Sequence, residues 1–309
     1  MWDIIGKRKF FFTFSAIVLG LGILAMLVWG VRLAIDFTGG TLLEVEFTNL
    51  QTEIQPADVV SMLEEMGYKG AIVQTVGESG LLLRLPPLQP EERRPILDAL
   101  QEKYGPLVEQ RFESVGPAVG TEVTQRAILA VAMASVGILL YLAFAFRNVP
   151  NPFRYGATAI VALVHDALVV IGTAAIMGKF FGWEVDALFL TAVLTVIGFS
   201  VHDTIVVFDR VRENRLKYRL APFEEVVNHS VIQTLDRSIN TQLTALFTLT
   251  AILLFGGVTI RQFIFWLIVG FVSGTYSSIC IAAPLLVAWE KGELKRLIPG
   301  RANGKAAAA

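Results

Sequence analysis

Two adjacent pairs of histidine and aspartate interrupt apolar stretches of this sequence. His202-Asp203 lies within residues 187–208, and His165-Asp166 lies within residues 155–177. A carboxylate near the middle of a lipid bilayer costs about 2.5–3.5 kcal/mol on insertion scales, so such a residue is expected to have a function. We interpret Asp203, in the longest unbroken apolar stretch, as a carboxyl group that takes up and releases a proton. The alternative is a structural aspartate that only accepts hydrogen bonds.

A row of polar residues follows Arg237 along the apolar stretch at 239–255. They recur at spacings of three and four residues, which places them on one face of a helix. The row consists of Asn240 or Thr241, Thr244 and Thr248. By the same geometry, Thr191 and Thr195 share a helix face with Asp203. We expect these two polar faces to meet inside a helix bundle.

The chemistry of such a site depends on the charge of its carboxyl group. Burial away from water favours the neutral form, whereas a nearby guanidinium favours the carboxylate. Arg237 suits the second role, because a guanidinium stays charged at any relevant pH. A membrane potential supplies about 2.3 kcal/mol per charge per 100 mV, enough to bias a conformational equilibrium. Taken by itself, however, Arg237 is better explained as a positive residue at the edge of the membrane.

The pair His165-Asp166 has two interpretations. Adjacent residues of a helix point to different faces, so the pair is either a secondary relay for the ion or an anchor between neighbouring helices. His202 likewise lies beside Asp203 on another face, and its role stays open. The sequence contains no metal-ligand cluster, nucleophile–base arrangement or phosphate-binding glycine loop, so it does not support an enzyme or a bound cofactor.

The composition indicates a membrane protein. Of the 309 residues, 54% are hydrophobic and only 17% charged, and the mean hydropathy is +0.60. Such values are too apolar for an ordinary soluble domain. The net charge of −1 argues against a nucleic-acid partner, and a single cysteine, Cys280, allows no disulfide framework.

Hydropathy predicts a polytopic α-helical protein with spans near the ~20 residues that a bilayer core requires. The six predicted transmembrane helices are residues 10–29, 128–146, 155–177, 187–208, 239–255 and 263–287. The first is longer than the apolar core of a signal peptide and lacks a small-residue cleavage site. We therefore interpret it as a retained transmembrane helix.

The distribution of basic residues predicts the orientation. One side of the membrane receives Lys7, Arg8, Lys9, Arg147, Arg154, Arg210, Arg212, Arg215, Lys217, Arg219, Lys291, Lys295 and Arg296. The short loops of the opposite side contain only Lys179 and Arg261. Because basic loops stay in the cytoplasm, we expect both termini to be cytoplasmic.

The segment at 32–126 differs in composition and is expected to face the outside of the cell. Residues 41–47 alternate as in a strand, 56–66 have helical spacing, and 71–76 with 81–85 resemble a hairpin. A second helix follows from 90 to 104, and 107–113 fits a last strand. The order β-α-β-β-α-β predicts an external α+β ferredoxin-like domain between the first two transmembrane helices.

The remaining parts complete the predicted organisation. Residues 1–31 form the cytoplasmic N-terminus and first helix, and 127–290 form a five-helix transmembrane bundle. Residues 209–236 are expected to be a charged cytoplasmic loop, either a connector on anionic lipid or a docking surface. Residues 291–309 are expected to be a cytoplasmic tail.

Three motifs resemble one known family. They are IDFTGG at 35–40 after the first span, VGP at 115–117 before the second, and HDTIVVFDR at 202–210. Together, with six spans and one large external domain, they resemble the SecD/SecF family of the bacterial protein-export machinery. The resemblance implies an RND-like architecture that covers nearly the whole chain. Because the chain has its own basic N-terminus, we expect a separate subunit rather than half of a fusion.

The resemblance also implies partners and site residues. The family's essential membrane aspartate corresponds to Asp203, and its essential arginine corresponds to Arg237 within QTLDRS at 233–238. The chain would pair with SecD in the bacterial inner membrane and assist the SecYEG channel and SecA in moving preproteins outward, with YidC and YajC as further partners. The proton-motive force would drive this work. Protons are the expected coupling ions, with sodium as the alternative.

Two other functions stay open from the sequence. An RND-like half could export small molecules, although a single external domain of under about 100 residues is short for an enclosed substrate pocket. A passive assembly subunit that holds SecD and other membrane proteins is the other alternative. Such a scaffold would tolerate the loss of its buried charge.

Overall fold

The computed structural model describes residues 2–52, 54–77, 79–147, 149 and 151–293. The chain divides into two compact units. One unit contains the residues up to Arg32 and those from Val131 onward, and the other contains Leu33–Ala130. Of the tail predicted at 291–309, everything from 294 lies outside the described residues.

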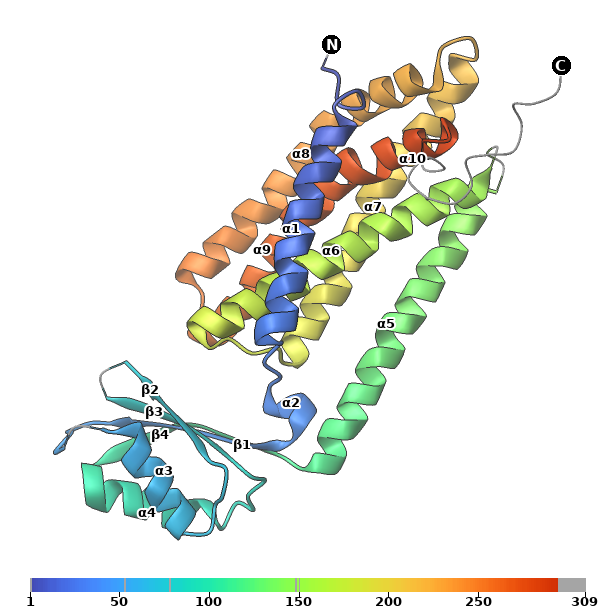
Figure 1. Ribbon diagram of the computed structural model, residues 1–309. Coiled ribbons are helices and arrows are strands. Elements are labelled where there is room, and N and C mark those ends of the chain that lie inside the picture. The colour runs from blue at the N-terminus through green and yellow to red at the C-terminus, as the bar shows by residue number, and fades with distance from the viewer. Residues whose placement is uncertain (1, 53, 78, 148, 150, 294–309) are drawn as a thin grey trace. The chain divides into compact units, whose positions relative to one another are not determined.

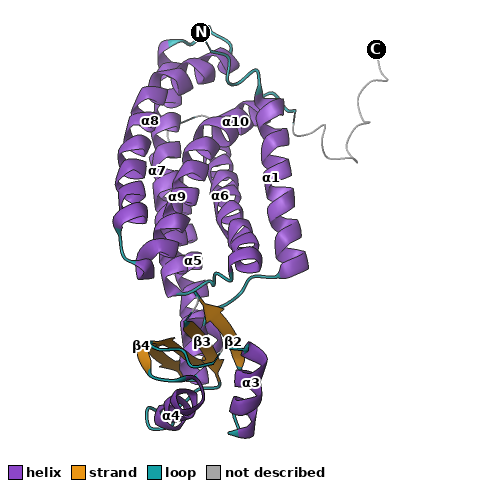
Figure 2. Cartoon of the chain, turned by 90° about the vertical axis from the view of Figure 1, so that its left-hand side faces the viewer, coloured by secondary structure: helices purple, strands orange, loops and turns teal. Residues whose placement is uncertain are grey.

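Within the described residues, six helical runs are long and apolar enough to cross a membrane (Figure 1). Five are α1 (Arg8–Trp29), α5 (Pro117–Ala145), α6 (Pro152–Phe181), α7 (Ala187–Lys217) and α8 (Phe223–Phe255). The sixth joins α9 (Val258–Ser277), the π-helical turn η1 (Ser278–Ala282) and α10 (Ala283–Glu290). The predicted polytopic helical fold is therefore confirmed, and Figure 2 shows α6, α7, α8 and α9 running along a common direction.

The prediction that residues 209–236 form a loop is wrong, because most of this charged segment is helical. Helix α7 continues to Lys217 and α8 begins at Phe223, so only residues 218–222 connect them. The extra turns form because they have a buried face of their own, on which Asn214 Nδ2 donates to Ser230 Oγ at 2.9 Å. Hydropathy located the apolar part of each helix but not its ends, since an amphipathic extension contains too many charges to register as apolar.

The smaller unit is built on a four-stranded antiparallel sheet in the order β2-β3-β1-β4. Its elements are α2 (Ile35–Thr38), β1 (Gly40–Phe47), α3 (Pro56–Glu65), β2 (Ile72–Val76), β3 (Gly80–Leu85), α4 (Arg93–Tyr104) and β4 (Leu107–Val115). Figure 1 shows α3 and α4 against one face of the sheet, over a core that includes Leu43, Leu83 and Ile96. The predicted ferredoxin-like order is confirmed.

Two glycines join α2 to β1. Gly39 and Gly40 have φ angles of +72° and +131°, a region that side chains with a Cβ rarely adopt. A Cβ on Gly39 would lie 3.0 Å from Pro117 Cα. The turn at this pair therefore requires glycine for both conformation and space.

Helix α7 lies at the centre of the membrane unit and contacts α6, α8 and α9. Its contact with α9 is close because α9 presents glycines there. A Cβ on Gly274 would lie 3.0 Å from Ser200 Cβ, and a Cβ on Gly270 would overlap the Val196 side chain. Small residues at such crossings let helix backbones approach closely. This close approach fixes the position of α7 relative to α9.

Helices α1 and α6 cross at a second pair of glycines. A Cβ on Gly172 would lie 2.7 Å from Gly22 Cα, which real side chains essentially never show. The first helix therefore packs on the bundle through direct backbone contact.

This crossing predicts the effect of a single methyl group. We expect Gly172→Ala to lower the free energy of unfolding in detergent by about 1–3 kcal/mol, because the added carbon forces α1 away from α6. Gly137→Ala is the matched control, since no atom lies within 4 Å of a Cβ built on Gly137 in α5. The control is expected to be neutral or slightly stabilising. Equal effects of the two substitutions in denaturant titrations would contradict the crossing.

Candidate ion-coupling site

The Asp203 carboxyl group lies between α7 and α8. Ser238 Oγ on α8 donates a hydrogen bond to Asp203 Oδ1 at 2.6 Å. The second oxygen, Oδ2, is buried and has no hydrogen-bond partner among the described residues. Leaving a buried oxygen unpaired costs free energy, so a bound proton, cation or water molecule would stabilise this group.

A small cavity of about 20 Å³ adjoins this carboxyl group. Its lining consists of Phe199, His202, Asp203, Val206, Arg237, Ser238 and Thr241. A volume of this size admits about one water molecule. The predicted pair of Asp203 and Arg237 thus meets at one cavity, with Arg237 exposed and Asp203 half-buried.

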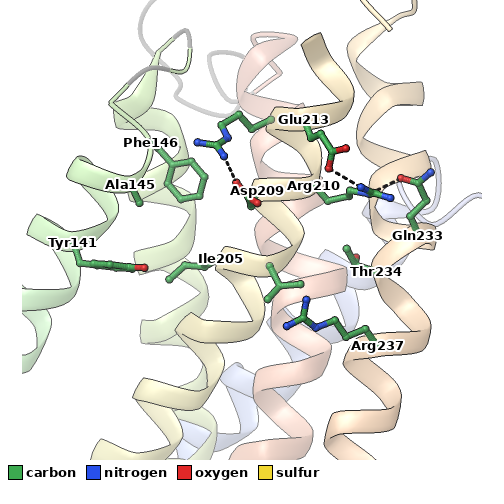
Figure 3. A pocket seen from close by; sticks show the side chains of 12 residues that line it. Tyr141, Ala145, Phe146, Ile205, Asp209, Arg210, Glu213, Gln233, Thr234 and Arg237 are labelled. Carbon is green, nitrogen blue, oxygen red and sulfur yellow. Dashed lines mark hydrogen bonds and ion pairs between the residues drawn. The ribbon is translucent and has the colours of Figure 1, made fainter. Parts of the chain in front are cut away.

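Arg237 also lines a larger cavity of about 640 Å³ (Figure 3). Its wall includes charged residues of α7, in which Arg210 pairs with Glu213 at 2.6 Å and Arg212 pairs with Asp209 at 2.6 Å. Tyr141 and Phe146, near the end of α5, form the opposite wall in Figure 3. Arg237 therefore borders both this charged cavity and the Asp203 cavity.

The prediction that two threonine-rich faces meet inside the bundle is wrong for this chain. Thr191, Thr195, Asn240, Thr241, Thr244 and Thr248 are all exposed. The hydroxyl groups of Thr195 and Thr244 bond to their own helices, at Thr191 O and Asn240 O. Only Thr241 reaches the Asp203 cavity.

The physical reason is a difference of one residue in helix phase. The face of α8 that packs on the bundle contains Thr234, Ser238 and Gln242, which are buried. The predicted row begins at Arg237, one residue earlier, and so lies about 100° around the helix. Sequence reasoning missed Ser238 for this reason; the available signal was its spacing of four from Thr234 and Gln242, which makes a second small-polar row.

The two histidine candidates lie in different environments. His202 is exposed and borders the Asp203 cavity. His165 and Asp166 are buried on α6 and do not border that cavity. Although they were expected to point apart, His165 Nδ1 lies 3.0 Å from Asp166 Oδ1. This pair is thus a separate cluster.

The fold and the site define a multi-pass membrane protein with an intramembrane carboxyl group beside an arginine. Residues 96–292 match the family profile described as protein export membrane protein SecD/SecF, C-terminal, and residues 25–49 match the SecD/SecF GG motif. The first match covers more than half of the chain. The chain belongs to the SecD/SecF family.

Relatives of similar length support this membership. The chain is 50% identical over 295 residues to the protein translocase subunit SecF of Anaerolinea thermophila, covering 95% of this chain and 96% of the relative. It is 40% identical over 297 residues to SecF of Pseudomonas aeruginosa, covering 93% and 92%. The GG motif of the family includes Gly39 and Gly40, whose role in the α2–β1 turn the structure explains.

A solved structure has the same fold. The crystal structure of SecDF from Thermus thermophilus, named as a translocon-associated membrane protein, matches with a TM-score of 0.80 and 33% sequence identity. The match covers 94% of this chain and 40% of the SecDF chain. The protein translocase subunit SecDF of Bacillus subtilis is 36% identical over 301 residues, which are 39% of its length.

The Ser238 bond predicts the reactivity of Asp203 toward a hydrophobic carbodiimide, which modifies carboxyl groups inside membranes. We expect Ser238→Ala to raise the labelling rate of Asp203 about tenfold, because the carboxyl group loses a hydrogen bond of roughly 1.5 kcal/mol and its cavity widens. The measurement is peptide mapping by mass spectrometry after timed labelling. Thr244→Val is the matched control and should leave the rate unchanged, because its hydroxyl bonds only to Asn240 O.

Proposed function

We propose that this chain is an ion-driven subunit of the bacterial protein translocase and that Asp203 is its coupling group. The observation that carries the proposal is the Asp203 carboxyl group, which has one oxygen bonded to Ser238 and the other unpaired. A carboxylate whose oxygens are all hydrogen-bonded would be stabilised in its charged form. This one lies at a cavity for about one water molecule, with Arg237 in its wall.

The coupling would arise because a proton and the Arg237 guanidinium compete for the second oxygen of Asp203. A proton on Asp203 removes the cost of an unpaired charge in the membrane, and an approaching guanidinium removes the same cost by a different route. Loading and release of the proton would therefore accompany movement of α8 against α7. Transfer of one charge through 100 mV supplies about 2.3 kcal/mol to drive that movement.

The proposed partner is SecD. The SecDF relatives of Bacillus subtilis and Thermus thermophilus match this chain over only 39% and 38% of their length, so in them the counterpart of this chain is fused to a larger protein. The polar rows of α7 and α8 are exposed in this chain. His202 and Arg237 on the same two helices are also exposed, and a second membrane subunit against them would shield these ionisable groups from lipid.

The wider assembly is proposed on the same basis. The chain would lie in the bacterial inner membrane with both termini in the cytoplasm, and its ferredoxin-like domain would face outward. With SecD it would assist SecYEG and SecA in preprotein export, with YidC and YajC as further partners. It would act as a transport subunit rather than an enzyme, since the site offers charge transfer without a reacting bond.

The test replaces the two coupling residues. We expect Asp203→Asn and Arg237→Met to abolish the ion-driven part of preprotein processing in cells while the chain still co-purifies with SecD. Glu225→Gln is the control, an exposed carboxylate on α8 that borders neither the Asp203 cavity nor the larger cavity beside Arg237. It should export normally. Normal export by both coupling variants would overturn the proposal, and loss of assembly would instead favour a scaffold.

A second test concerns the ion. We propose the proton, because a cavity of about 20 Å³ with one free carboxylate oxygen offers few of the six or so oxygen ligands that a metal cation prefers. Export into inverted vesicles should stop when the proton gradient is collapsed under a maintained sodium gradient. Sustained export under those conditions would assign the coupling to sodium.

A further inference from the structure

A second aspartate, Asp166 on α6, has no exposed surface at all. Its carboxylate accepts hydrogen bonds from Ser200 Oγ at 2.6 Å, Ser273 Oγ at 2.7 Å and Ser277 Oγ at 2.6 Å. His165 Nδ1 lies 3.0 Å from the same group. We call these five residues the Asp166 cluster. It joins α6 to α7 through Ser200 and to α9 through the other two serines.

The two intramembrane aspartates differ in how well they are satisfied. A carboxylate offers about four acceptor positions, and the Asp166 cluster supplies four partners. Asp203 has one hydroxyl partner and one unpaired oxygen. A buried polar network with every member paired makes its surroundings rigid, whereas a partly paired group is free to respond. The geometry of Asp166 therefore suits holding a position rather than changing its charge.

Ser200 connects this cluster to the coupling residue. It precedes Asp203 by three residues on α7, which is less than one turn and about 4.5 Å along the axis. The two side chains leave the helix on neighbouring faces, Ser200 toward α6 and α9, and Asp203 toward α8. A bond that fixes the Ser200 side of this turn also fixes the direction in which the Asp203 carboxyl group points.

The contact with α9 reinforces the same turn. Thr204 Oγ1 lies 2.8 Å from Ser278 Oγ, at the start of the π-helical turn η1. A π turn is wider than an α turn and occurs often at functional sites. Ser277, the last residue of α9, donates to Asp166, and Ser278, the first residue of η1, lies against Thr204.

We propose that Asp166 is a positioning residue for Asp203, acting through Ser200. Its carboxylate holds α7 at one rotation and depth and thereby sets the distance from the Asp203 carboxyl group to Ser238 and Arg237. This inference rests on the proposed coupling role of Asp203. It gives the buried pair His165-Asp166 a function distinct from an ion relay.

The competing explanation is that the cluster only holds the helices together. Two serines of the cluster separate the explanations, because each donates one hydroxyl to the same carboxylate. Ser200 lies on α7 beside Asp203, and Ser273 lies on α9. Loss of either hydroxyl removes one bond from Asp166, but only Ser200→Ala removes a bond to the turn of α7 that contains Asp203.

The experiment measures carbodiimide labelling of Asp203 across a range of pH, on membranes that contain the full chain with its SecD partner. Ser200→Ala is expected to move the midpoint of the labelling profile by about half a pH unit or more, since the surroundings of the carboxyl group change. Ser273→Ala is expected to leave the midpoint in place. Co-purification with SecD confirms that both variants assemble.

Each outcome decides the question. Equal midpoints for Ser200→Ala and the unsubstituted chain, or equal shifts for both serine variants, would overturn the positioning role. If Ser200→Ala does not accumulate, Asp166→Asn, which keeps the volume of the side chain, is judged by the same shift. Labelling does not depend on export, so normal export by Asp203→Asn would overturn the proposed function while the labelling profiles still test the positioning of Asp203.

Discussion

The structure depends on one constraint, the free-energy cost of placing a carboxyl group within a membrane-spanning helix. The chain meets that cost in two ways. Asp166 is fully enclosed by three serine hydroxyls and a histidine nitrogen, whereas among the described residues Asp203 has one hydroxyl partner and one unpaired oxygen. The first arrangement is complete within this chain. The second is completed only by something that arrives, such as a proton, a water molecule or a guanidinium, and this is what makes it a candidate for coupling.

Helix α7 unites the two arrangements, because Ser200 belongs to one and Asp203 to the other. Glycines of α9 allow the close approach on the Ser200 side, and Ser238 of α8 makes the contact on the Asp203 side. A displacement of α8 would therefore change one set of contacts while the other is retained. Such an asymmetric packing of one helix is a physical basis for motion of one part of a bundle against a fixed part.

The exposed polar rows on α7 and α8 gain meaning from family membership. Their threonines are exposed and most bond to their own helices, whereas the neighbouring His202 and Arg237 are ionisable groups whose exposure to lipid would be unfavourable. In the SecDF relatives the counterpart of this chain is part of a protein more than twice as long. A partner subunit against these rows would explain why residues of this kind are retained on the outer surface of an otherwise apolar bundle.

The amino-acid sequence by itself determined the six apolar spans and the β-α-β-β-α-β order and singled out Asp203 as a candidate, because hydropathy, periodicity and the cost of buried charge are local properties. Arg237 became a candidate only through the family resemblance. Only the tertiary structure decided which face of α8 is buried, and hence that Ser238 rather than the threonine row bonds to Asp203. It likewise decided that α7 and α8 extend into 209–236 and leave only 218–222 between them, and that Ser200, Ser273 and Ser277 converge on Asp166. Periodicity defines the faces of a helix, but the neighbouring helix that each face meets depends on contacts between residues far apart in the chain.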